Sequence, residues 1–288
     1  HAVRRARGVI VHAEYCRRYL RAAGCRTPVY VVPHPPLSDG WLRRPPPRSV
    51  RRALRTIRSR PGTVLVGVLG DINPAKRIDV VVEALDRLGD ASIHLAVVGR
   101  RIPDFSVEGV IPGAADRITV ATDVSDPEFL GWLQACDIVV NLRDPHRGEV
   151  SGTLMRALQA GVPTIVSGVG TYLDWPEDAV VRLGAGPPDP GELALALEGL
   201  IRDPVRRAEI GERARALMRE EHDRLSAAHG YGAAIDGTLR LLRDPTRAGL
   251  GRWASSLAEM GATPDLVAQG HGVRYARGLQ ELASAGSR

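Results

Sequence analysis

Residues 137–170 read DIVVNLRDPHRGEVSGTLMRALQAGVPTIVSGVG. The apolar, β-branched run at 138–140 is typical of a buried parallel strand. After a polar loop, apolar residues recur with helical spacing from Ser151 until Gly161, a residue type that commonly follows the last turn of a helix. A second apolar run at 162–167 predicts another strand. The stretch therefore predicts a strand, a helix and a second strand in direct succession.

The start of this helix is suited to an anion. A short helix that follows a strand directs its first backbone N–H groups at the carboxyl edge of the sheet, where the helix dipole attracts negative charge. Ser151 can cap the helix, and the residue three positions later is Leu154 rather than an acid that would occupy the N–H groups. We therefore expect a phosphate group to bind here. An ordinary capped helix of an α/β domain is the alternative.

The same alternation continues on both sides of this stretch. Strands are predicted at 64–69, 93–98 and 118–121, and helices at 78–88, 127–135, 193–201 and 204–242. This order indicates an α/β fold with a doubly wound parallel sheet and C-terminal helices. In such sheets, ligands bind beyond the carboxyl ends of the strands.

Four segments are predicted along the chain. Residues 1–36 have the pattern of one strand–helix–strand unit, which is too small to bury a sheet on both faces, so we expect it to end an amino-terminal domain whose beginning is missing. Residues 37–60 form a basic linker, residues 61–245 the main domain, and residues 246–288 a helical extension. His1 in place of methionine fits a fragment, a trimmed chain or one part of a split protein.

The linker carries eight arginines between Trp41 and Arg60 and no acidic residue. Its apolar residues from Val50 to Ile57 fall on one face of a helix predicted at 49–59. Two interpretations stay open. The segment from Arg43 to Arg60 docks on an anionic membrane surface, or its apolar face packs on the next domain.

Composition excludes several classes of function. The chain has 288 residues, 44% of them hydrophobic, and no apolar run long enough to span a bilayer, so we expect a cytoplasmic protein, at most peripheral to the inner membrane face. The net charge of +6 comes with only 4% aromatic residues, too few for the stacking platforms of nucleic-acid binding. Three cysteines without C-x-x-C spacing and eight scattered histidines predict no metal site.

Two charged residues at the predicted strand ends suit a sugar nucleotide. Lys76, the only lysine of the chain, follows the strand that ends before Gly70, and a cation near a helix start is favourable when an anion binds beside it. Glu149 precedes the central helix, where a carboxylate beside a bound pyrophosphate would accept hydrogen bonds from sugar hydroxyls. The alternatives are a chance surface lysine and a carboxylate that only complements the helix dipole. The G-x-G-x-x-G fingerprint of dinucleotide-binding enzymes is absent from the sequence.

Five segments in this region form a recognisable series. They are GVLGDINPAKRIDVVVEAL (67–85), HLAVVGR (94–100), ITVATDVSDPEFLGWLQACDIVVNL (118–142), GEVSGTLMRALQAGVPTIVSGVG (148–170) and DPVRRAEIGERARALMREEH (203–222). In this order they resemble the carboxyl-terminal, donor-binding domain of family 4 retaining glycosyltransferases, whose two Rossmann-like domains form the GT-B fold. Residues 1–36 resemble the end of the matching amino-terminal domain.

The resemblance implies transfer of a sugar from a nucleoside diphosphate to a hydroxyl, with retention and without a metal or other cofactor. The implied acceptor is a glycan, a lipid or a small molecule, chosen by the missing amino-terminal domain. Lys76 and Glu149 are the implied catalytic residues. Lys76 would contact the donor pyrophosphate, and Glu149 corresponds to the first glutamate of the family's E-x7-E motif, which touches the donor sugar.

Further donor contacts are implied around these two residues. They are Gly70, Asp71, Gly99, Arg100, Thr122, Asp123, Ser151, Gly152, Thr153, Leu154 and Arg156. The four residues from Ser151 match backbone donors to the phosphates, while Thr122 and Asp123 lie where the family holds the base. Two positions depart from the family: Asp71 stands where many members have an arginine, and Arg156 replaces the second motif glutamate, usually a ribose ligand, at a spacing one residue shorter.

Two other classes of function stay open. A sugar-nucleotide 2-epimerase shares the GT-B architecture, but it needs acid and base carboxylates and histidines in the cleft, and the predicted strand ends supply few. A non-catalytic subunit that binds a sugar nucleotide or another protein fits the missing half, and binding without turnover in the full-length protein would select it.

Overall fold

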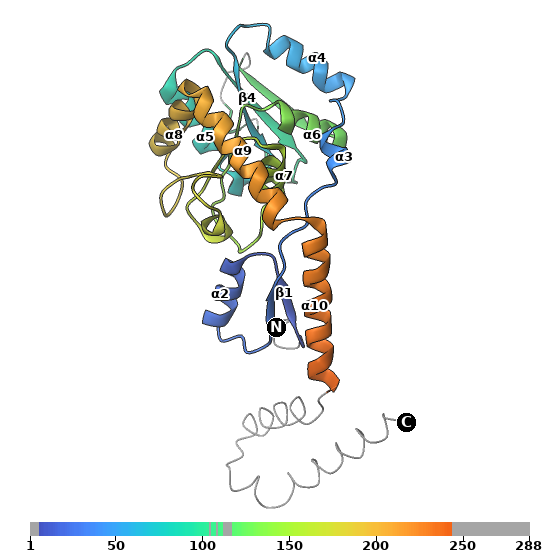
Figure 1. The fold of residues 1–288 in the computed structure, drawn as a ribbon. Helices are drawn as coiled ribbons and strands as arrows, with labels where there is room; N and C mark the ends of the chain where they lie inside the picture. Colours follow the sequence, from blue (N-terminus) through green and yellow to red (C-terminus); the bar gives the residue numbers. More distant parts are fainter. Residues whose placement is uncertain (1–5, 104, 108, 112–116, 244–288) are drawn as a thin grey trace, which may run out of the picture. The chain divides into compact units, whose positions relative to one another are not determined.

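The computed structural model of the chain describes residues 6–103, 105–107, 109–111 and 117–243 (Figure 1). The helical extension predicted at 246–288 lies outside the described residues. The chain divides into two compact units: the first comprises His1–Ile10, Cys25–Tyr30 and His229–Arg288, and the second comprises Val11–Gly24 and Val31–Ala228. The domain boundaries predicted near residues 36, 60 and 245 stay predictions.

The first unit contains, in its described part, the beginnings of two strands and most of one helix. These are strands β1 (Val9–Val11) and β2 (Val29–Val31) and helix α10 (Arg224–Arg243). Gly237 lets α10 approach β2 closely, since a Cβ there would lie 2.6 Å from the hydroxyl oxygen of Tyr30. Helix α2 (Glu14–Ala22) follows β1 and precedes β2, in the strand–helix–strand order predicted for this part of the chain.

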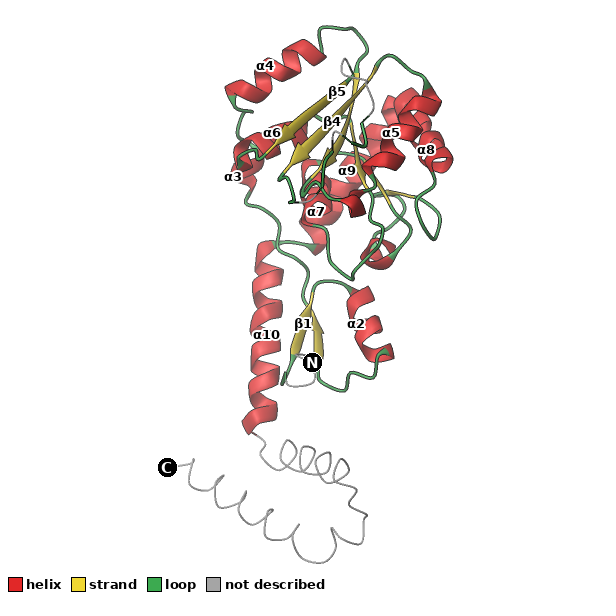
Figure 2. Cartoon of the chain, turned by 180° about the vertical axis from the view of Figure 1, so that it is seen from behind, coloured by secondary structure: helices red, strands yellow, loops and turns green. Residues whose placement is uncertain are grey.

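The second unit is built on a parallel sheet, which is six-stranded in the described residues (Figures 1 and 2). Its strands are β3 (Val64–Leu69), β4 (Ile93–Gly99), β5 (Ile118–Thr122), β6 (Ile138–Asn141), β7 (Thr164–Val166) and β8 (Val181–Arg182). They lie in the order β5-β4-β3-β6-β7-β8, so the winding direction reverses between β3 and β6. This is the strand order of a Rossmann-like sheet, and the predicted fold class is confirmed.

Helices cover both faces of this sheet. They are α4 (Arg48–Ile57), α5 (Ile78–Leu88), α6 (Asp126–Ala135), α7 (Gly152–Ala160), α8 (Pro190–Arg202) and α9 (Pro204–Glu221). One core cluster joins α5 and α8 to one face, and a second joins α4, α6 and α7 to the other (Figure 1). All six residues of β3 are buried, which explains why its sequence VLVGVL is apolar throughout.

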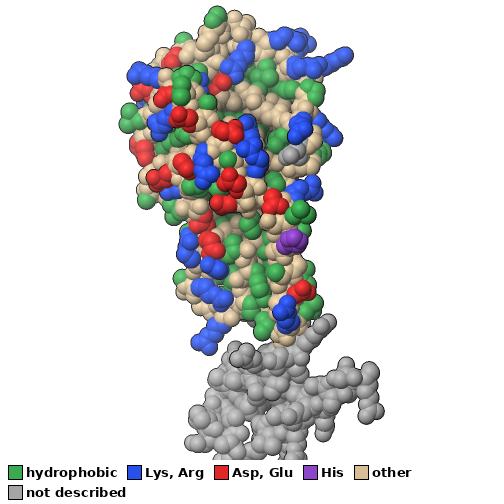
Figure 3. Space-filling model, viewed as in Figure 1, with side chains coloured by type: hydrophobic (Ala, Val, Ile, Leu, Met, Phe, Trp, Pro, Cys, Tyr) green, Lys and Arg blue, Asp and Glu red, His purple; other side chains and the backbone are tan. Residues whose placement is uncertain are grey.

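Helix α4 shows where the apolar face of the basic linker lies. Val50 and Ile57 are buried in the cluster that α4 shares with α6 and the sheet, so the helix packs on the domain. Its apolar face is therefore not open to a membrane, although the arginines from Arg43 to Arg60 are exposed. Figure 3 shows Lys and Arg side chains gathered over α4. Within the described ranges, no helix combines the length and apolarity needed to cross a bilayer.

The single helix predicted at 204–242 is in fact two, α9 and α10. Asp223 separates them, because its carboxylate accepts hydrogen bonds from the backbone N–H groups of Leu225 (2.8 Å) and Ser226 (3.0 Å) and so caps α10. Four short elements were not predicted, since too few residues form them for a period to show. They are β8 and the segments α3 (Asp39–Leu42), η1 (Pro74–Lys76) and η2 (Gly170–Asp174).

Candidate functional site

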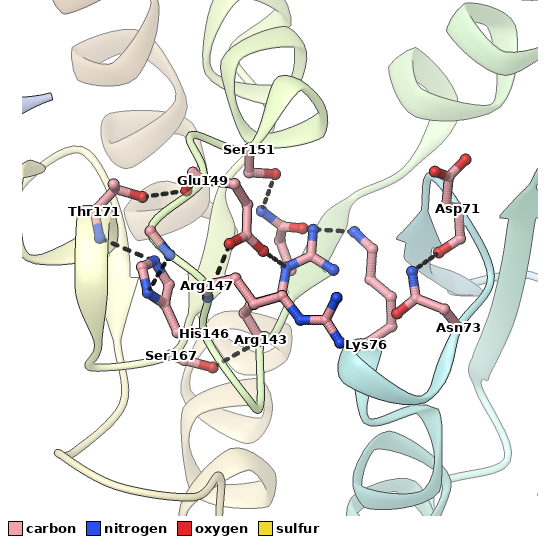
Figure 4. Close-up of polar contacts among 12 residues, drawn as sticks. Asp71, Asn73, Lys76, Arg143, His146, Arg147, Glu149, Ser151, Ser167 and Thr171 are labelled. Atoms are coloured by element: carbon pink, nitrogen blue, oxygen red, sulfur yellow. Dashed lines mark hydrogen bonds and ion pairs between the residues drawn. The ribbon is translucent and has the colours of Figure 1, made fainter. Parts of the chain in front are cut away.

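Lys76 is buried at the carboxyl end of β3, with 2% of its surface exposed. It ends the one-turn helix η1, and Arg77 then adopts a left-handed conformation (φ 49°) before α5 begins. This turn directs the ammonium back under the sheet edge, where Nζ donates a hydrogen bond to Oδ1 of Asn141 at 2.9 Å (Figure 4). Lys76 is thus an interior cation at the point where the winding of the sheet reverses, and not a chance surface lysine.

The charge of Lys76 is poorly compensated. Burial, and after it the positive charge of Arg143, lower the pKa of Lys76 from 10.5 to about 7, and the attraction of Asp71 and Glu149 only partly opposes them. Among the described residues no carboxylate lies within salt-bridge distance of Lys76, and the hydrogen bond of its ammonium goes to the neutral amide of Asn141. A buried cation with this environment is the arrangement expected where an anionic ligand supplies the missing charge.

Asn141 connects the ends of β3 and β6 with the start of α7. It is fully buried as the last residue of β6. Its amide nitrogen donates to Oγ of Ser151 at 2.9 Å and to the hydroxyl of Tyr172 at 3.3 Å, while its oxygen accepts from Lys76. The amide therefore holds the ammonium and the helix cap in one hydrogen-bonded chain.

Arg143 and Glu149 form an ion pair beside Lys76. Nε of Arg143 lies 3.0 Å from a carboxylate oxygen of Glu149, and the arginine side chain is 14% exposed (Figure 4). The backbone N–H of Arg147 donates to the other carboxylate oxygen at 2.9 Å. Nε of Arg143 is nevertheless buried without a hydrogen bond of good geometry, so the pair is close but leaves donor capacity unused.

The N-terminus of α7 completes this cluster. Ser151 caps the helix as predicted, with its hydroxyl accepting from the N–H of Leu154 at 3.2 Å. The N–H of Leu154 is therefore occupied, and the open donors at this helix end are those of Gly152 and Thr153. Thr153 also lies against Gly70, where an added Cβ would sit 2.7 Å from its hydroxyl oxygen and 3.4 Å from Nζ of Lys76. Gly70 thus leaves the space in which these groups meet.

The loop between β6 and α7 is held by His146. Its Nδ1 faces the N–H of Gly148 at 3.0 Å and its Nε2 faces the N–H of Thr171 at 3.2 Å (Figure 4). A neutral imidazole has one unprotonated nitrogen and accepts one of these bonds at a time. Burial lowers the pKa of His146, with Glu149 acting in the opposite direction. His146 therefore acts as a neutral clamp on the loop that presents Glu149.

The predicted residues at the ends of β3, β4 and β5 form a second polar group. Nε and Nη2 of Arg100 donate to the two carboxylate oxygens of Asp71, at 3.0 Å and 2.9 Å, and both side chains are largely exposed. Gly99 brings β4 against the turn after β3, since a Cβ there would lie 1.7 Å from the carbonyl oxygen of Gly70. Asp123, in a left-handed conformation (φ 55°), donates its backbone N–H to the carbonyl of Gly99 at 2.7 Å.

Two other predicted residues lie apart from the Lys76 cluster. Thr122 is the last residue of β5 and is partly exposed. Arg156 lies over the ring of Phe129 on α6, with its guanidinium carbon 5.3 Å from the ring centroid. It has no hydrogen bond or ion pair with another described residue.

The structure thus brings together Lys76, Glu149, Gly70 and the start of α7, and it places Asp71, Gly99, Arg100 and Asp123 in the neighbouring turns. Sequence analysis missed Asn141, Arg143 and His146. Asn141 carried a signal, because a polar residue that ends the apolar run IVVN has to find partners in the sheet edge. Arg143 carried none, since arginine is common throughout this chain.

Part of the second unit matches the model of a known protein family. Residues 62–203 match the model described as glycosyl transferases group 1. No curated protein matches the chain.

Several solved structures share the fold. Sucrose-phosphate synthase from Thermosynechococcus elongatus aligns with a TM-score of 0.67 and 21% identity, over 83% of this chain and 60% of that one. HepE from Anabaena, crystallised in complex with UDP, aligns with a TM-score of 0.68 and 17% identity, over 82% of this chain and 65% of its own. The C-terminal domain of LpcC, a glycosyl transferase group 1 family protein from Francisella tularensis, aligns with a TM-score of 0.50 and 18% identity, over 62% of this chain and 96% of that domain.

These alignments define how much of such a protein is present. The chain spans 60% of the length of the sucrose-phosphate synthase and 65% of the length of HepE. At these identities the likeness concerns the fold. The second unit has the Rossmann-like architecture of a GT-B domain, and over residues 62–203 the chain matches the glycosyl transferases group 1.

Proposed function

We propose that this chain carries the donor-binding half of a family 4 retaining glycosyltransferase, which moves a sugar from a nucleoside diphosphate to a hydroxyl group. One observation carries the proposal: the buried Lys76 and the neighbouring Arg143 meet the N-terminus of α7 where the sheet reverses its winding. Ligands of open α/β sheets bind at this point, and cations with a helix N-terminus suit a diphosphate. The family match to residues 62–203 supports the same class of reaction.

The proposed role of the cationic group is to stabilise the departing diphosphate. Lys76, Arg143 and the N–H groups of Gly152 and Thr153 would surround the phosphates, and electrostatic stabilisation of the leaving group would lower the barrier. Arg143 would also supply the second cation that many family members place at the position of Asp71. With two cations and a helix end in place, we propose that no divalent metal is required. Activity that is unchanged by EDTA would be the expected result.

Glu149 is proposed to hold the donor sugar. Its carboxylate accepts the N–H of Arg147 and pairs with Arg143, and its side chain is 39% exposed, so a lone pair can still reach a ligand. A carboxylate fixed in this way can accept hydrogen bonds from sugar hydroxyls and orient the anomeric carbon toward the acceptor. Because the same arginine contacts the leaving phosphate in the proposed complex, sugar orientation and leaving-group stabilisation depend on one ion pair.

Arg156 is proposed to bind the ribose or its phosphate. A glutamate at this position would accept hydrogen bonds, whereas a guanidinium can only donate them. Ribose hydroxyls accept as well as donate, and Arg156 has unused donors above the ring of Phe129. Thr122 and Asp123 would lie beside the base.

A cavity beside Glu149 is the proposed path of the acceptor. It has a volume of about 330 Å³ and is lined by Tyr15, Tyr19 and Leu20 of α2 and by residues 146–148. The rings of Tyr15 and Tyr19 are stacked, with centroids 6.3 Å apart. Aromatic faces with hydroxyl groups suit a ring-shaped hydroxyl compound such as a sugar. An enzyme of this kind would work in the cytoplasm, where we place the protein.

Calorimetric titration of the chain with UDP, GDP, dTDP and ADP tests the proposal. UDP is the first ligand to test because HepE, which shares this fold, was crystallised with UDP and with UDP-glucose. We expect one nucleotide to bind in the micromolar range and the Lys76→Met variant to lose that binding. Arg87→Gln, which removes an exposed arginine of α5, is the matched control and should bind normally. A folded chain that binds none of the four would contradict a donor site formed by this chain.

Turnover separates the remaining classes. With UDP-sugar and a range of hydroxyl acceptors, a transferase releases UDP in step with glycoside formation. Conversion of the sugar nucleotide to its 2-epimer would identify the epimerase alternative instead. Binding without either product in the full-length protein would select the non-catalytic sugar-nucleotide-binding subunit.

A further inference from the structure

A second cavity lies at the opposite edge of the sheet from the Lys76 cluster. It has a volume of about 710 Å³ and lies between α4 and the first residues of three strands. Thr63 and Ile93 line it at the start of β3 and β4, and Ile118 lines it at the start of β5. The carboxyl ends of the same strands carry the proposed donor site, so one ligand cannot occupy both places.

The lining of this cavity is strongly cationic. Arg52, Arg60 and Arg117 contribute guanidinium groups and His94 contributes an imidazole, while no Asp or Glu of the described chain lines it. Asp90 lies just beyond, but its carboxylate already accepts from the N–H and the hydroxyl of Ser92, at 2.8 Å and 2.7 Å. Arg117 is partly compensated, since its Nη1 donates to the backbone carbonyl of Asp90 at 3.3 Å and the Asp90 carboxylate attracts its charge. Arg52 and Arg60 border the cavity with no carboxylate in its described lining.

The guanidinium groups of Arg52 and Arg60 have no hydrogen-bond or ion-pair partner among the described residues. Arg58 donates to the carbonyls of Thr63 and Ala135 and pairs with Asp137 at 2.8 Å. In contrast, the side chains of Arg52 and Arg60 make no hydrogen bond or ion pair with any other described residue. Free arginines on a convex surface are ordinary, but these two border a concave space.

The other polar groups of the wall cannot compensate for them. The hydroxyls of Ser59 and Thr63 donate to backbone carbonyls, at 2.7 Å and 2.8 Å, so their protons are engaged. Nε2 of His94 lies 2.8 Å from the hydroxyl of Thr119. Burial and then the charge of Arg60 lower the pKa of His94, which is consistent with a positive potential inside a partly desolvated space.

We propose that this cavity is a second anion site, which binds a phosphate-bearing ligand on the guanidinium groups of Arg52 and Arg60, with Arg117 opposite. The planar guanidinium matches two phosphate oxygens at once, which favours phosphate over a monodentate anion. The phosphate can come from a free phosphorylated compound or from the headgroup of an anionic phospholipid. The exposed Arg48 and Arg51 of α4 adjoin the site and would face a membrane in the second case.

Histidine NMR of the whole chain tests this site separately from the donor site. His94 reports on the new cavity and His146 on the donor loop, and each ring is assigned with its own Gln variant. Titration with inorganic phosphate should shift the His94 signals. The double variant Arg52→Gln/Arg60→Gln should weaken this binding at least tenfold, which corresponds to about 1.4 kcal/mol or more. The control Arg48→Gln/Arg51→Gln removes the same amount of charge from α4 at positions that do not line the cavity, and it should leave the titration unchanged.

Cosedimentation with vesicles identifies the source of the phosphate. Vesicles of phosphatidylcholine with phosphatidic acid are compared with phosphatidylcholine alone. A larger loss of binding in the cavity variant than in the control variant assigns the site to a lipid headgroup, and equal losses assign it to a free phosphorylated compound. The proposal is overturned if neither phosphate nor acidic vesicles move the His94 signals, or if the folded cavity variant still responds as the wild type does.

Discussion

Nε of Arg143 lies 3.0 Å from the carboxylate of Glu149, and the same guanidinium depresses the pKa of the buried Lys76. One arginine thus connects the residue proposed to hold the donor sugar with the residue proposed to hold its diphosphate. Lys76 and Arg143 repel each other in the ligand-free protein, and the carboxylates of Asp71 and Glu149 only partly offset this repulsion. Such an arrangement is unfavourable until an anion binds, and this has consequences for both stability and affinity.

Replacement of Lys76 by methionine should stabilise the ligand-free protein. The pKa of Lys76 is about 7 in the folded protein, below the ordinary lysine pKa of 10.5 that applies to the unfolded chain. The unfolded chain therefore binds the proton more tightly. As a result, the free energy of unfolding of the wild type rises as the pH increases from 7 to 10.5. At pH 6 we expect Lys76→Met to gain roughly 1–3 kcal/mol, after the loss of the hydrogen bond to Asn141 is subtracted.

Urea denaturation at pH 6, 8 and 10 measures this effect. The advantage of the variant should shrink as the pH rises, because the wild-type lysine becomes neutral. A variant that is less stable than the wild type at pH 6 would show that the buried ammonium is well compensated in the free protein.

Binding of UDP should be coupled to proton uptake. A diphosphate beside Lys76 raises its pKa above about 7, so the protein takes up a proton on binding above that pH. Affinity should therefore fall as the pH rises above about 7, and level off once the pH exceeds the pKa of Lys76 in the complex. Calorimetry in two buffers of different ionisation enthalpy measures the number of protons. Lys76→Arg, which stays charged at every pH tested, should show none of this uptake.

Arg143→Met should weaken UDP binding by about 10- to 100-fold, because one charge-assisted contact to phosphate is lost. The pKa of Lys76 should rise at the same time, since the repulsion from Arg143 is removed. Arg87→Gln is the control, because it removes an exposed arginine of α5 that pairs with Glu83 and lies outside the proposed donor site. Equal losses in both variants would show that general positive charge, and not the position of Arg143, holds the nucleotide.

Gly99→Ala should destabilise the second unit by about 3 kcal/mol or more, because the added Cβ would overlap a backbone atom that cannot rotate away. That atom is the carbonyl oxygen of Gly70, at 1.7 Å. Gly199→Ala in α8 is the matched control: the nearest atom to its Cβ would be 3.7 Å away, and alanine favours helices. Thermal unfolding of both variants measures the effect. A Gly99→Ala protein as stable as the wild type would mean that the turns at Gly70 and Gly99 can move apart without cost.

The fold could be predicted in large part from sequence, as particular elements show. Val64–Leu69 is a continuous apolar run because both of its faces are buried, and Ile78–Leu88 repeats its apolar residues with helical spacing. In both segments the local pattern therefore predicts the secondary structure. The break at Asp223 was missed, because an aspartate inside a helical pattern looks like a surface residue until its carboxylate is seen to cap the next helix.

The site divides in a similar way. Lys76 was predicted because it is the only lysine, and Glu149 and Ser151 because they stand just before or at a helix start. Arg143 was missed, since its role depends on its distance from Glu149 and Lys76. The cavity beside α4 could not be predicted from the sequence either. Arg52 and Arg117 are far apart along the chain, and they line one cavity only because β5 lies beside β4.

The sequence by itself determined the alternation of strands and helices, the parallel sheet and the place of a helix N-terminus after β6, because burial pattern and capping are local properties of the chain. The tertiary structure decided which charges stand together. It buried Lys76 against Asn141, paired Arg143 with Glu149 beside Lys76, and left the side chains of Arg52 and Arg60 without a hydrogen bond or ion pair to any other described residue. Electrostatic energies depend on distance and burial in three dimensions, and neither quantity can be read from the order of residues.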